Sequence, residues 1–302
     1  MTVMEVLSVL LFKIRNSEFH TQSFCCIISE RERIRTQRRK RMLKQYNLFL
    51  FDMDGTLYLG DQLYDFTKVL LSTIRAKGKR YLFMTNNSSK SVADYVKKLA
   101  KLGIEATEED FITSSQATAY YLKLHHAGAK LYVCGTNSLK KELEKNGFTV
   151  TENLDEVEVI VMGFDTELTF KKLEDVSKLL LTRGEIPYIA TNPDYVCPTE
   201  YGSVPDCGSV CDMIYNATKK RPVVIGKPEA LMPQLAMQQH GYTKEETMVI
   251  GDRIYTDIKS GLKAGIGTIL VLSGETTQEI LDASEEKPQF VMQSAAEMIP
   301  EL

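Results

Sequence analysis

The feature that most limits the fold is an alternation between short apolar runs and amphipathic stretches, which begins at Leu48. Such short runs are typical of buried strands, and the longer stretches place apolar residues at helical spacing. This order predicts an α/β fold in which a doubly wound parallel sheet carries helices on both faces. The expected strands are Leu48–Phe51, Tyr81–Met84, Leu131–Val133, Val157–Met162, Ile186–Ala190, Val223–Ile225, Met248–Ile250, Thr268–Leu272 and Gln289–Met292.

The stretches between the runs predict the helices. Ser91–Leu102 has apolar residues at helical spacing, and Gly103 follows it in the place of a C-cap. The other expected helices are Ser114–Leu124, Ser138–Lys145, Phe170–Thr182, Pro228–His240 and Thr256–Ala264. Residues 128–221 have strands and helices of their own. They lie between the second and the third of four polar clusters, described below, that each follow a predicted strand. We therefore expect a core domain made of residues 46–127 and 222–302, with residues 128–221 as an inserted α/β domain.

Residues 1–45 differ in charge from the rest of the chain. They hold ten Lys/Arg and four Asp/Glu, a balance of +6, so the net charge of −3 leaves −9 for the remainder. Arg31–Lys44 reads as a basic arm for phosphate polymers or membrane, or Met1–Ile14 as a targeting segment with its charges in the wrong order. The interpretation that we favour is that residues 1–41 are not native, because Met42 stands just before the first strand. Residues 1–45 are then an extension that is disordered or not native.

Composition excludes several classes of protein. An acidic body is not expected to bind nucleic acid, and no apolar run reaches the roughly 18 residues that span a bilayer. The six cysteines lack CxxC spacing, so we expect reduced thiols in a cytoplasmic protein. Cys207 and Cys211 have no further metal ligands nearby and are predicted to be buried thiols on one helical turn. His125 and His126 are expected to be helix-end residues without a role.

The first polar cluster is Asp52-Met53-Asp54-Gly55-Thr56, directly after a predicted strand. Two carboxylates two residues apart can divide catalytic work, since one can attack while the other handles protons. Gly55 allows close approach of the backbone, whose N–H groups can hold phosphate oxygens. The alternatives are a solvated turn or a calcium loop, but a calcium loop needs a glutamate at its twelfth position and more oxygen ligands than follow here.

Two further clusters combine hydroxyl, amide and ammonium groups. Thr85-Asn86-Asn87-Ser88 follows the run that ends at Met84, where it reads either as an anion site or as an ordinary helix cap. Gly226-Lys227-Pro228 follows the run that ends at Ile225, and its lysine can offset the negative charge of phosphate next to carboxylates. Most lysines are only solvated surface charges. A functional role for Lys227 is favoured because Gly226 and Pro228 place it on a turn between a predicted strand and a predicted helix.

The fourth cluster is Gly251-Asp252-Arg253, followed by Asp257 at the start of a predicted helix. Asp252 can supply an oxygen ligand to a hard cation, and Asp257 can orient a bound water or hold Lys227, although both can also be capping acids. All four clusters follow predicted strands, and ligands of open α/β sheets bind at that edge.

In combination, the DxDGT sequence at Asp52 and the GDxxxTD sequence from Gly251 to Asp257 resemble the haloacid dehalogenase (HAD) superfamily of phosphatases. The resemblance runs from Leu48 to the C-terminus. Thr85-Asn86-Asn87-Ser88 and the large insertion are similar to the NagD-like, p-nitrophenyl-phosphatase-like branch, subfamily IIA. It implies a HAD-like Rossmannoid core with an inserted α/β cap, and hydrolysis of small phosphomonoesters.

The resemblance also implies a role for each motif residue. Asp52 would be the nucleophile, Asp54 the general acid and base, and Lys227 the charge neutraliser. Thr85, Asn86 and Asn87 would bind the phosphate. Mg²⁺ would be held by the Asp52 carboxylate, the Asp54 backbone carbonyl and Asp252, with Asp257 in support.

The cap and the rival functions remain open from sequence alone. The loop 192–209, with Tyr195, Cys197, Thr199 and Tyr201, is expected to face the nucleophile, or else to be a surface loop shaped by its prolines. The sequence does not decide among sugar phosphates, phosphoglycolate, nucleotides and other small phosphates as substrates. A phosphotransferase or mutase of this fold, and a receiver-like phosphoacceptor module, are the alternatives. A homodimer that pairs through the cap is a further expectation.

Overall fold

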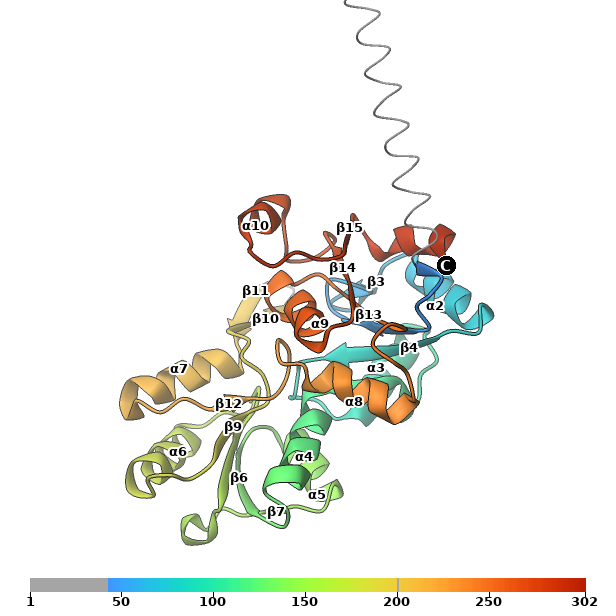
Figure 1. Cartoon of the computed structure of the whole chain (residues 1–302). Helices are drawn as coiled ribbons and strands as arrows, with labels where there is room; N and C mark the ends of the chain where they lie inside the picture. Colours follow the sequence, from blue (N-terminus) through green and yellow to red (C-terminus); the bar gives the residue numbers. More distant parts are fainter. Residues whose placement is uncertain (1–42, 200) are drawn as a thin grey trace, which may run out of the picture. The chain divides into compact units, whose positions relative to one another are not determined.

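The computed structural model describes residues 43–199 and 201–302, so the predictions about residues 1–41 lie outside the described residues. Residues 46–299 form one compact unit that holds two parallel sheets (Figure 1). The expected α/β fold class, with a doubly wound core sheet and a second α/β layer built around its own sheet, is confirmed.

The first sheet has six parallel strands in the order β15-β14-β13-β1-β4-β5. The first strand of the chain, β1, lies in the middle of this sheet; β4 and β5 follow on one side of it, and β13, β14 and β15 on the other. The carboxyl ends of β1 and its two neighbours therefore meet at the switch point where such sheets bind ligands. The strands are β1 (Leu48–Phe51), β4 (Arg80–Thr85), β5 (Phe111–Thr113), β13 (Thr247–Gly251), β14 (Gly267–Val271) and β15 (Phe290–Met292).

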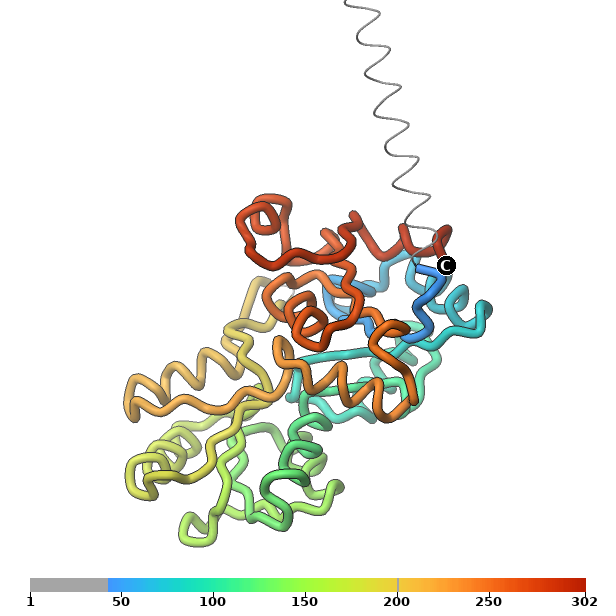
Figure 2. Tube along the Cα trace, in the orientation of Figure 1, coloured from blue at the N-terminus to red at the C-terminus, as the bar shows by residue number. Residues whose placement is uncertain are grey.

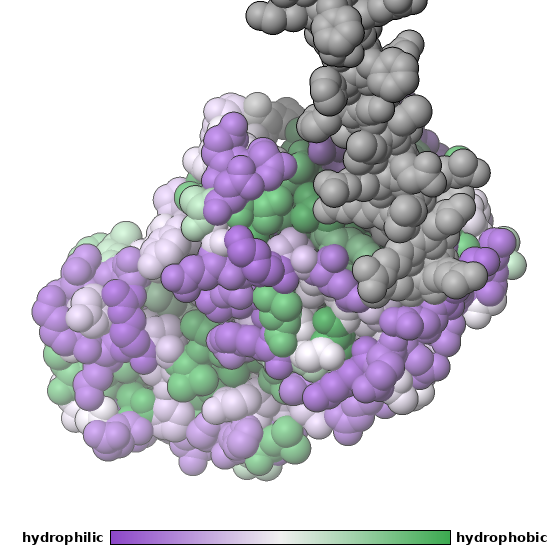
Figure 3. Space-filling view, turned by 45° about the horizontal axis from the view of Figure 1, so that its top comes forward, coloured by the Kyte–Doolittle hydropathy of each residue, from purple (hydrophilic) through white to green (hydrophobic). Residues whose placement is uncertain are grey.

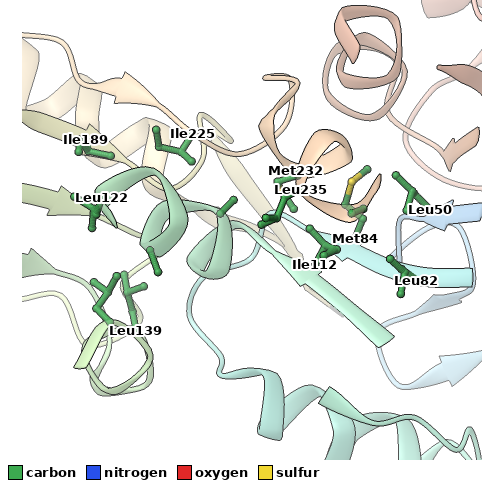
Figure 4. Packing of buried hydrophobic residues seen from close by; sticks show 14 of the residues in the cluster. Leu50, Leu82, Met84, Ile112, Leu122, Leu139, Ile189, Ile225, Met232 and Leu235 are labelled. Carbon is green, nitrogen blue, oxygen red and sulfur yellow. The ribbon is translucent and has the colours of Figure 1, made fainter. Parts of the chain in front are cut away.

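The two faces of this sheet carry different side chains. Leu50, Leu82 and Met84 point to an aliphatic face that packs against Met232 and Leu235 of helix α8 (Leu231–His240), as Figure 4 shows. Helix α9 (Lys259–Ala264) covers the same face. Every residue of the central strands β1 and β13 and of β14 is buried.

The opposite face of the first sheet is aromatic. Phe83 lies 5.2 Å from Phe111, and Phe111 lies 5.9 Å from Tyr95 of helix α3 (Val92–Lys101), measured between ring centroids. Helix α2 (Thr67–Ala76) packs on this side of β4. Burial of each such ring stabilises the fold by about 1.5–3 kcal/mol.

The second sheet has five parallel strands in the order β12-β9-β8-β6-β7. Helices α6 (Phe170–Thr182) and α7 (Cys207–Thr218) pack on one of its faces, and α5 (Asn137–Lys145) covers the other. The strands are β6 (Lys130–Cys134), β7 (Thr149–Val150), β8 (Val159–Met162), β9 (Tyr188–Ala190) and β12 (Val223–Val224).

One apolar cluster continues from the first sheet into the second. Helix α4 (Ser114–His125), which follows β5, contributes Leu122 to it, and Leu139 and Ile189 join from the second sheet and its helix α5 (Figure 4). Figure 2 follows the trace from green α4 through the second sheet and back to the orange helix α8. The second sheet is therefore packed onto the core by buried side chains as well as tethered to it.

The Val223–Ile225 run departs from expectation. We predicted a strand that ends at the same sheet edge as the other three clusters, but β12 pairs with β9 of the second sheet. The pairing continues as Ile225 N donates to Ala190 O at 3.0 Å and Gly226 N to Thr191 O at 2.9 Å. The prediction was wrong because an apolar run does not say which of two sheets it joins. β12 belongs to the second sheet although it lies beyond residue 221, where we placed the end of the inserted domain. The exact limits of the two domains therefore stay a prediction.

Several short elements have no counterpart in the prediction. The strands β5 and β7, and the helices α2 and α10 (Gln278–Ala283), were not foreseen, and α7 was foreseen only as one turn that carries Cys207 and Cys211. The same holds for two hairpins, β2–β3 (Tyr58–Leu59 and Gln62–Leu63) and β10–β11 (Val196–Thr199 and Gly202–Pro205). Two to four residues per strand are too few for a periodic pattern. The predicted helix Thr256–Ala264 begins instead with a π-helical turn, η3 (Ile254–Ile258), before α9.

Other local predictions are confirmed. Helix α3 ends at Lys101 with Gly103 in a left-handed conformation (φ +74°) just beyond it. Helix α4 ends at His125, and His126 is its C-cap. Cys207 and Cys211 are both buried on α7 with their sulfurs 4.0 Å apart. Within residues 43–199 and 201–302, no helix is long and apolar enough to cross a membrane. The face in Figure 3 mixes hydrophilic and hydrophobic side chains.

Candidate functional site

Three carboxylates and one lysine converge beyond the carboxyl ends of β1 and β13. Asp52 follows β1, Asp252 follows β13 and Asp257 lies in η3; each offers an oxygen within 4.8 Å of the others. Lys227 Nζ donates to Asp52 Oδ1 and to Asp257 Oδ1, both at 2.6 Å. The predicted convergence of the first, third and fourth clusters is therefore present in the structure.

Burial and charge act in opposite directions on these groups. Burial disfavours the charge of Lys227, but the carboxylates of Asp257 and Asp52 outweigh it and raise its pKa above the usual value. Burial raises the pKa of Asp52, and the charges of Asp257 and Asp252 raise it further, while Lys227 opposes them. Three carboxylates against one ammonium leave two excess negative charges if all ionise. Such a site favours a divalent cation.

The donor set fits a hard metal ion. Asp252 Oδ2 accepts a hydrogen bond from Glu275 N at 2.7 Å, but Oδ1 is buried and has no partner among the described residues. A buried, unpartnered carboxylate oxygen is costly unless a ligand or ion completes it. Burial, and next the charge of Asp257, raise the pKa of Asp252 to about 6. The acidic triad can thus hold a metal ion through oxygen ligands, the donors that Mg²⁺ and Ca²⁺ prefer.

Asp54 lies at the mouth of the same site. Its side chain is 47% exposed, and Lys98 Nζ lies 4.0 Å from its Oδ1. Partial withdrawal from water raises the pKa of Asp54, which Lys98 and Lys90 counteract. Gly55 bends the turn with φ +82°, and a Cβ atom there would lie 2.5 Å from Asp252 Oδ2. Only glycine therefore lets the first turn approach the fourth cluster so closely.

Asn86 holds the backbone of Lys227. Its Oδ1 accepts from Lys227 N at 2.8 Å, and its Nδ2 donates to Lys227 O at 2.9 Å and to Asp194 Oδ2 at 3.0 Å. Both polar atoms of the Asn86 side chain are therefore engaged, and only the backbone of Asn86 remains for a phosphate contact. That contact stays a prediction. Thr85 Oγ1 accepts from Asn87 N at 3.2 Å and shapes the turn after β4.

These groups line one small polar cavity of about 50 Å³, which suits a compact polar group. The hairpin β10–β11 closes one side of it, so part of the loop 192–209 faces the nucleophile as expected. Tyr195 and Tyr201 of that loop are largely exposed, by 60% and 83%. The lining residues are Asp52, Asp54, Thr85, Asn86, Asn87, Asp194, Val196, Cys197, Pro198, Asp206, Lys227, Arg253 and Thr256.

Asp194, Asp206 and Arg253 received no role from the sequence. Arg253 Nε pairs with Glu275 Oε2 at 2.7 Å, and its NH1 lies 4.0 Å from Asp194 Oδ2. Asp194 follows β9, so the rule that polar residues gather at strand carboxyl ends could have found it in the second sheet as well. Asp206 caps α7 and carried no comparable signal.

Asp206→Asn is expected to stabilise the protein at alkaline pH. Burial, together with the charge of Asp194, raises the pKa of Asp206 to about 7 against the bond from Cys207 N. Because the folded-state pKa lies above the unfolded one, the stability it contributes is present below pH 4 and lost as pH rises through 7. Asparagine keeps the cap acceptor. The gain at pH 8 is up to roughly 4 kcal/mol.

Thermal unfolding at pH 5 and pH 8 measures this effect. The Tm of the variant should exceed that of the wild type by clearly more at pH 8 than at pH 5, because the cost of keeping Asp206 protonated in the fold grows between pH 4 and pH 7. Asp155→Asn, at an exposed position on the second layer, is the matched control and should show no difference between the two pH values. Equal changes in Tm at both pH values would contradict the prediction.

Comparisons with known proteins agree with this geometry. Residues 49–149 match the haloacid dehalogenase-like hydrolase family, and residues 224–298 match a HAD-hydrolase-like family. A 5'-nucleotidase of Bacillus subtilis is 36% identical over 259 residues, which are 85% of this chain and 99% of that protein. An acid sugar phosphatase of Staphylococcus aureus is 34% identical over 260 residues, 86% of this chain and 99% of that protein.

A solved structure gives the same result. The crystal structure of a 4-nitrophenylphosphatase from Thermotoga maritima superposes with a TM-score of 0.81 at 39% identity, covering 86% of this chain and 98% of that one. The resemblance inferred from the motifs is confirmed over nearly all of the described residues. The chain belongs to the haloacid dehalogenase-like hydrolases, in their NagD-like, p-nitrophenyl-phosphatase-like subfamily.

Proposed function

We propose that this chain is a Mg²⁺-dependent phosphatase that hydrolyses small organic phosphomonoesters through a phosphorylated Asp52. The single observation that supports it most is the partly buried Asp52 carboxylate, which borders the small polar cavity and is paired with Lys227 at 2.6 Å. The relatives are named as a nucleotidase, a sugar phosphatase and a nitrophenylphosphatase, so small phosphomonoesters are the substrate class.

In the first half-reaction, an oxygen of Asp52 attacks phosphorus and the bond from phosphorus to the ester oxygen breaks. Asp54 donates its proton to the leaving oxygen, and its raised pKa keeps a larger share of it protonated near neutral pH. In the second half-reaction, Asp54 takes a proton from water, the water oxygen bonds to phosphorus, and the acyl phosphate bond to Asp52 breaks. Inorganic phosphate leaves and both aspartates are restored.

Charge and positioning come from the surrounding residues. Lys227 offsets the approach of a phosphate dianion to Asp52, and Asn86 fixes the lysine backbone. Thr85, Asn87 and the Asn86 backbone would bind the phosphoryl oxygens. Asp52, Asp252 and the Asp54 backbone carbonyl would hold Mg²⁺, with Asp257 in support; when bound, the ion stabilises negative charge on the phosphoryl oxygens.

Asp54→Asn tests the proton transfer with two leaving groups. An alkyl phosphate such as glycerol 3-phosphate needs protonation of its leaving oxygen, whereas 4-nitrophenolate leaves without it. We expect kcat for the alkyl ester to fall by about 10²–10⁴-fold. With 4-nitrophenyl phosphate, stopped-flow absorbance should show a burst of one 4-nitrophenolate per site, followed by slow turnover, because hydrolysis of the intermediate lacks its base.

The same assay, run with Mg²⁺ and with a chelator, tests the metal requirement, and Asp155→Asn serves again as the matched control. Equal losses on the two substrates, or the absence of a burst, would argue against the acid–base role of Asp54. Activity that survives the chelator unchanged would argue against the metal. Phosphorylated acceptor in place of free phosphate, after addition of an alcohol, would assign the chain to phosphotransfer.

A further inference from the structure

We propose that the site has a second anion subsite outside the catalytic cavity, formed by Lys90, Lys97, Lys98 and Lys101, here called the lysine patch. The favoured substrates are then phosphomonoesters whose leaving group carries another phosphate or carboxylate. This inference rests on the proposed function and specifies its substrate class.

Adjoining hollows connect the catalytic cavity to the lysine patch. Asp54 and Pro198 border both the cavity and a neighbouring hollow of about 530 Å³, which lies between the hairpins β2–β3 and β10–β11. Asp61 borders that hollow and the next, of about 610 Å³, whose wall is the lysine patch. A leaving group that departs past Asp54 therefore enters a space that ends among lysines.

The lysine patch carries more positive charge than the acids beside it offset. Lys90, Lys97 and Lys101 have no carboxylate oxygen within 4.0 Å anywhere in residues 43–199 and 201–302. Lys98 lies 4.0 Å from Asp54 and 4.2 Å from the centre of the Tyr58 ring. Four lysines face two acids in this hollow, although the chain after residue 45 carries a net charge of −9.

The two acids of the hollow offset only part of the charge of the four lysines. Asp94 Oδ2 accepts from Ser91 N at 3.1 Å and from Ser91 Oγ at 2.7 Å; these bonds, and the charge of Lys97, lower the pKa of Asp94, so it stands as one negative charge beside the four lysines. Asp61 is exposed on the turn of the β2–β3 hairpin. The hollow therefore keeps an excess of positive charge at the edge of an acidic molecule.

Helix geometry places the lysines where one anion can reach them. Lys97 and Lys101 are four residues apart on α3, and Lys98 and Lys101 are three apart, so all three lie on neighbouring positions of one face. Interaction with the helix dipole would account for Lys98 and Lys101 near the carboxyl end of α3. It does not account for Lys90, which precedes the helix and influences the pKa of Asp54.

Ligand chemistry follows from this arrangement. A phosphorylated carboxylic acid or a bisphosphate could place its reacting phosphate at Asp52 and its second anion at the lysines. Nucleoside monophosphates and 4-nitrophenyl phosphate carry no second phosphate or carboxylate and would gain nothing from the patch. We therefore expect a higher kcat/KM for substrates whose leaving group carries a second phosphate or carboxylate than for substrates without one.

The test removes three lysines and compares matched substrates. In Lys90→Ala/Lys97→Ala/Lys101→Ala, Lys98 is kept because it neighbours Asp54. The carboxylate arm compares 3-phosphoglycerate with glycerol 3-phosphate, which has CH₂OH in its place; the phosphate arm compares fructose 1,6-bisphosphate with fructose 6-phosphate. The control, Lys141→Ala/Lys178→Ala/Lys220→Ala, removes three exposed lysines of the second layer and gives the same change in net charge.

We expect the wild type to favour the substrate with two anionic groups in at least one arm. In the patch variant, the ratio of kcat/KM between the two substrates of that arm should fall about tenfold, mainly through KM. The control should keep the wild-type ratio, and salt should lower the ratio for the wild type and the control but not for the patch variant. A wild-type ratio near one in both arms, or an equal fall in variant and control, would overturn the subsite.

Failure of the proposed function has a different signature. If the wild type hydrolyses neither 4-nitrophenyl phosphate nor any of the four esters with Mg²⁺, the phosphatase proposal is wrong and the subsite falls with it. If hydrolysis is normal and depends on Asp52 while the ratios do not respond to the patch, only the subsite is wrong. Melting temperatures of both triple variants check that folding is retained, as exposed positions lead us to expect.

Discussion

Replacement of Asp52 by asparagine is expected to abolish hydrolysis, with kcat reduced by at least about 10⁴-fold, as for other enzymes that lose their nucleophile. A carboxamide oxygen is a poor nucleophile and cannot form the acyl phosphate. The change is nearly isosteric, and Asp52 borders the cavity with Lys227 at 2.6 Å, so the site should keep its shape. The measurement is phosphate release from several esters with Mg²⁺, over enzyme concentrations high enough to detect the residual rate.

Stability separates this effect from damage to the fold. Asp252 and Asp257 raise the pKa of Asp52, as burial does, so an uncharged side chain relieves repulsion among the three acids. The Tm of the variant without added metal should equal or exceed that of the wild type. Trapping with hydroxylamine should detect an acyl phosphate in the wild type during turnover and none in the variant. Hydrolysis at more than a tenth of the wild-type rate would rule out Asp52 as the nucleophile.

Sequence alone located the parts of this site that follow directly from single strands. Asp52 follows β1 and Asp252 follows β13, and these two strands are fully buried and adjacent in the sheet. The rule that ligands gather at the carboxyl ends of parallel strands then suffices to bring the two carboxylates together. Gly55 was also predictable, because a turn that lets the two motifs approach needs a residue without Cβ.

The origin of Lys227 was not predictable from its own neighbourhood. It arrives at the first sheet from β12 of the second, and a two-residue strand gives no indication of which sheet it joins. The role of Asn86 depends on a backbone 141 residues away, and no local pattern contains that information. The composition of the cluster Thr85-Asn86-Asn87-Ser88 suggested a helix cap or an anion site, whereas the side-chain amide of Asn86 holds the backbone of Lys227.

The second layer shows the same limit. The hairpin β10–β11 lines the cavity through Val196, Cys197 and Pro198, but its strands are too short and too exposed to give an alternating pattern. Asp194 and Asp206 are buried on either side of this hairpin. Long-range packing decides their burial, so sequence could indicate that the loop faces the nucleophile but could not identify the acids that it brings.

Lys227→Met is expected to reduce both activity and stability, and to do so more than any other single substitution of a site residue that is not an aspartate. Methionine fills a similar volume without charge. The variant leaves Asp52 and Asp257 without their shared cation, and kcat/KM should fall by about 10³-fold, because the phosphate dianion then meets uncompensated carboxylates. Removal of one partner from a buried ion pair also destabilises by roughly 3–5 kcal/mol.

The pH dependence of stability has a definite sign. The pKa of Lys227 is raised in the folded state, so its contribution is fully present at neutral pH and is lost only as strongly alkaline pH removes its proton. In the variant, Asp52, whose pKa is raised by burial and by its acidic neighbours, can take up a proton as pH falls, which relieves its repulsion with Asp257. The deficit in Tm relative to the wild type should therefore be larger at pH 8 than at pH 5, both measured with chelator present.

Two further variants separate charge from position. Lys263→Met removes a lysine paired with Glu229 at 2.6 Å, but both side chains are about 40% exposed, so a loss of at most about 1 kcal/mol is expected. Asn86→Ala keeps the ammonium while releasing the Lys227 backbone, and should reduce kcat/KM less than Lys227→Met does. If Lys227→Met kept activity within tenfold of the wild type, the lysine would be a structural counter-ion for Asp257, and Asp52 would need another source of screening.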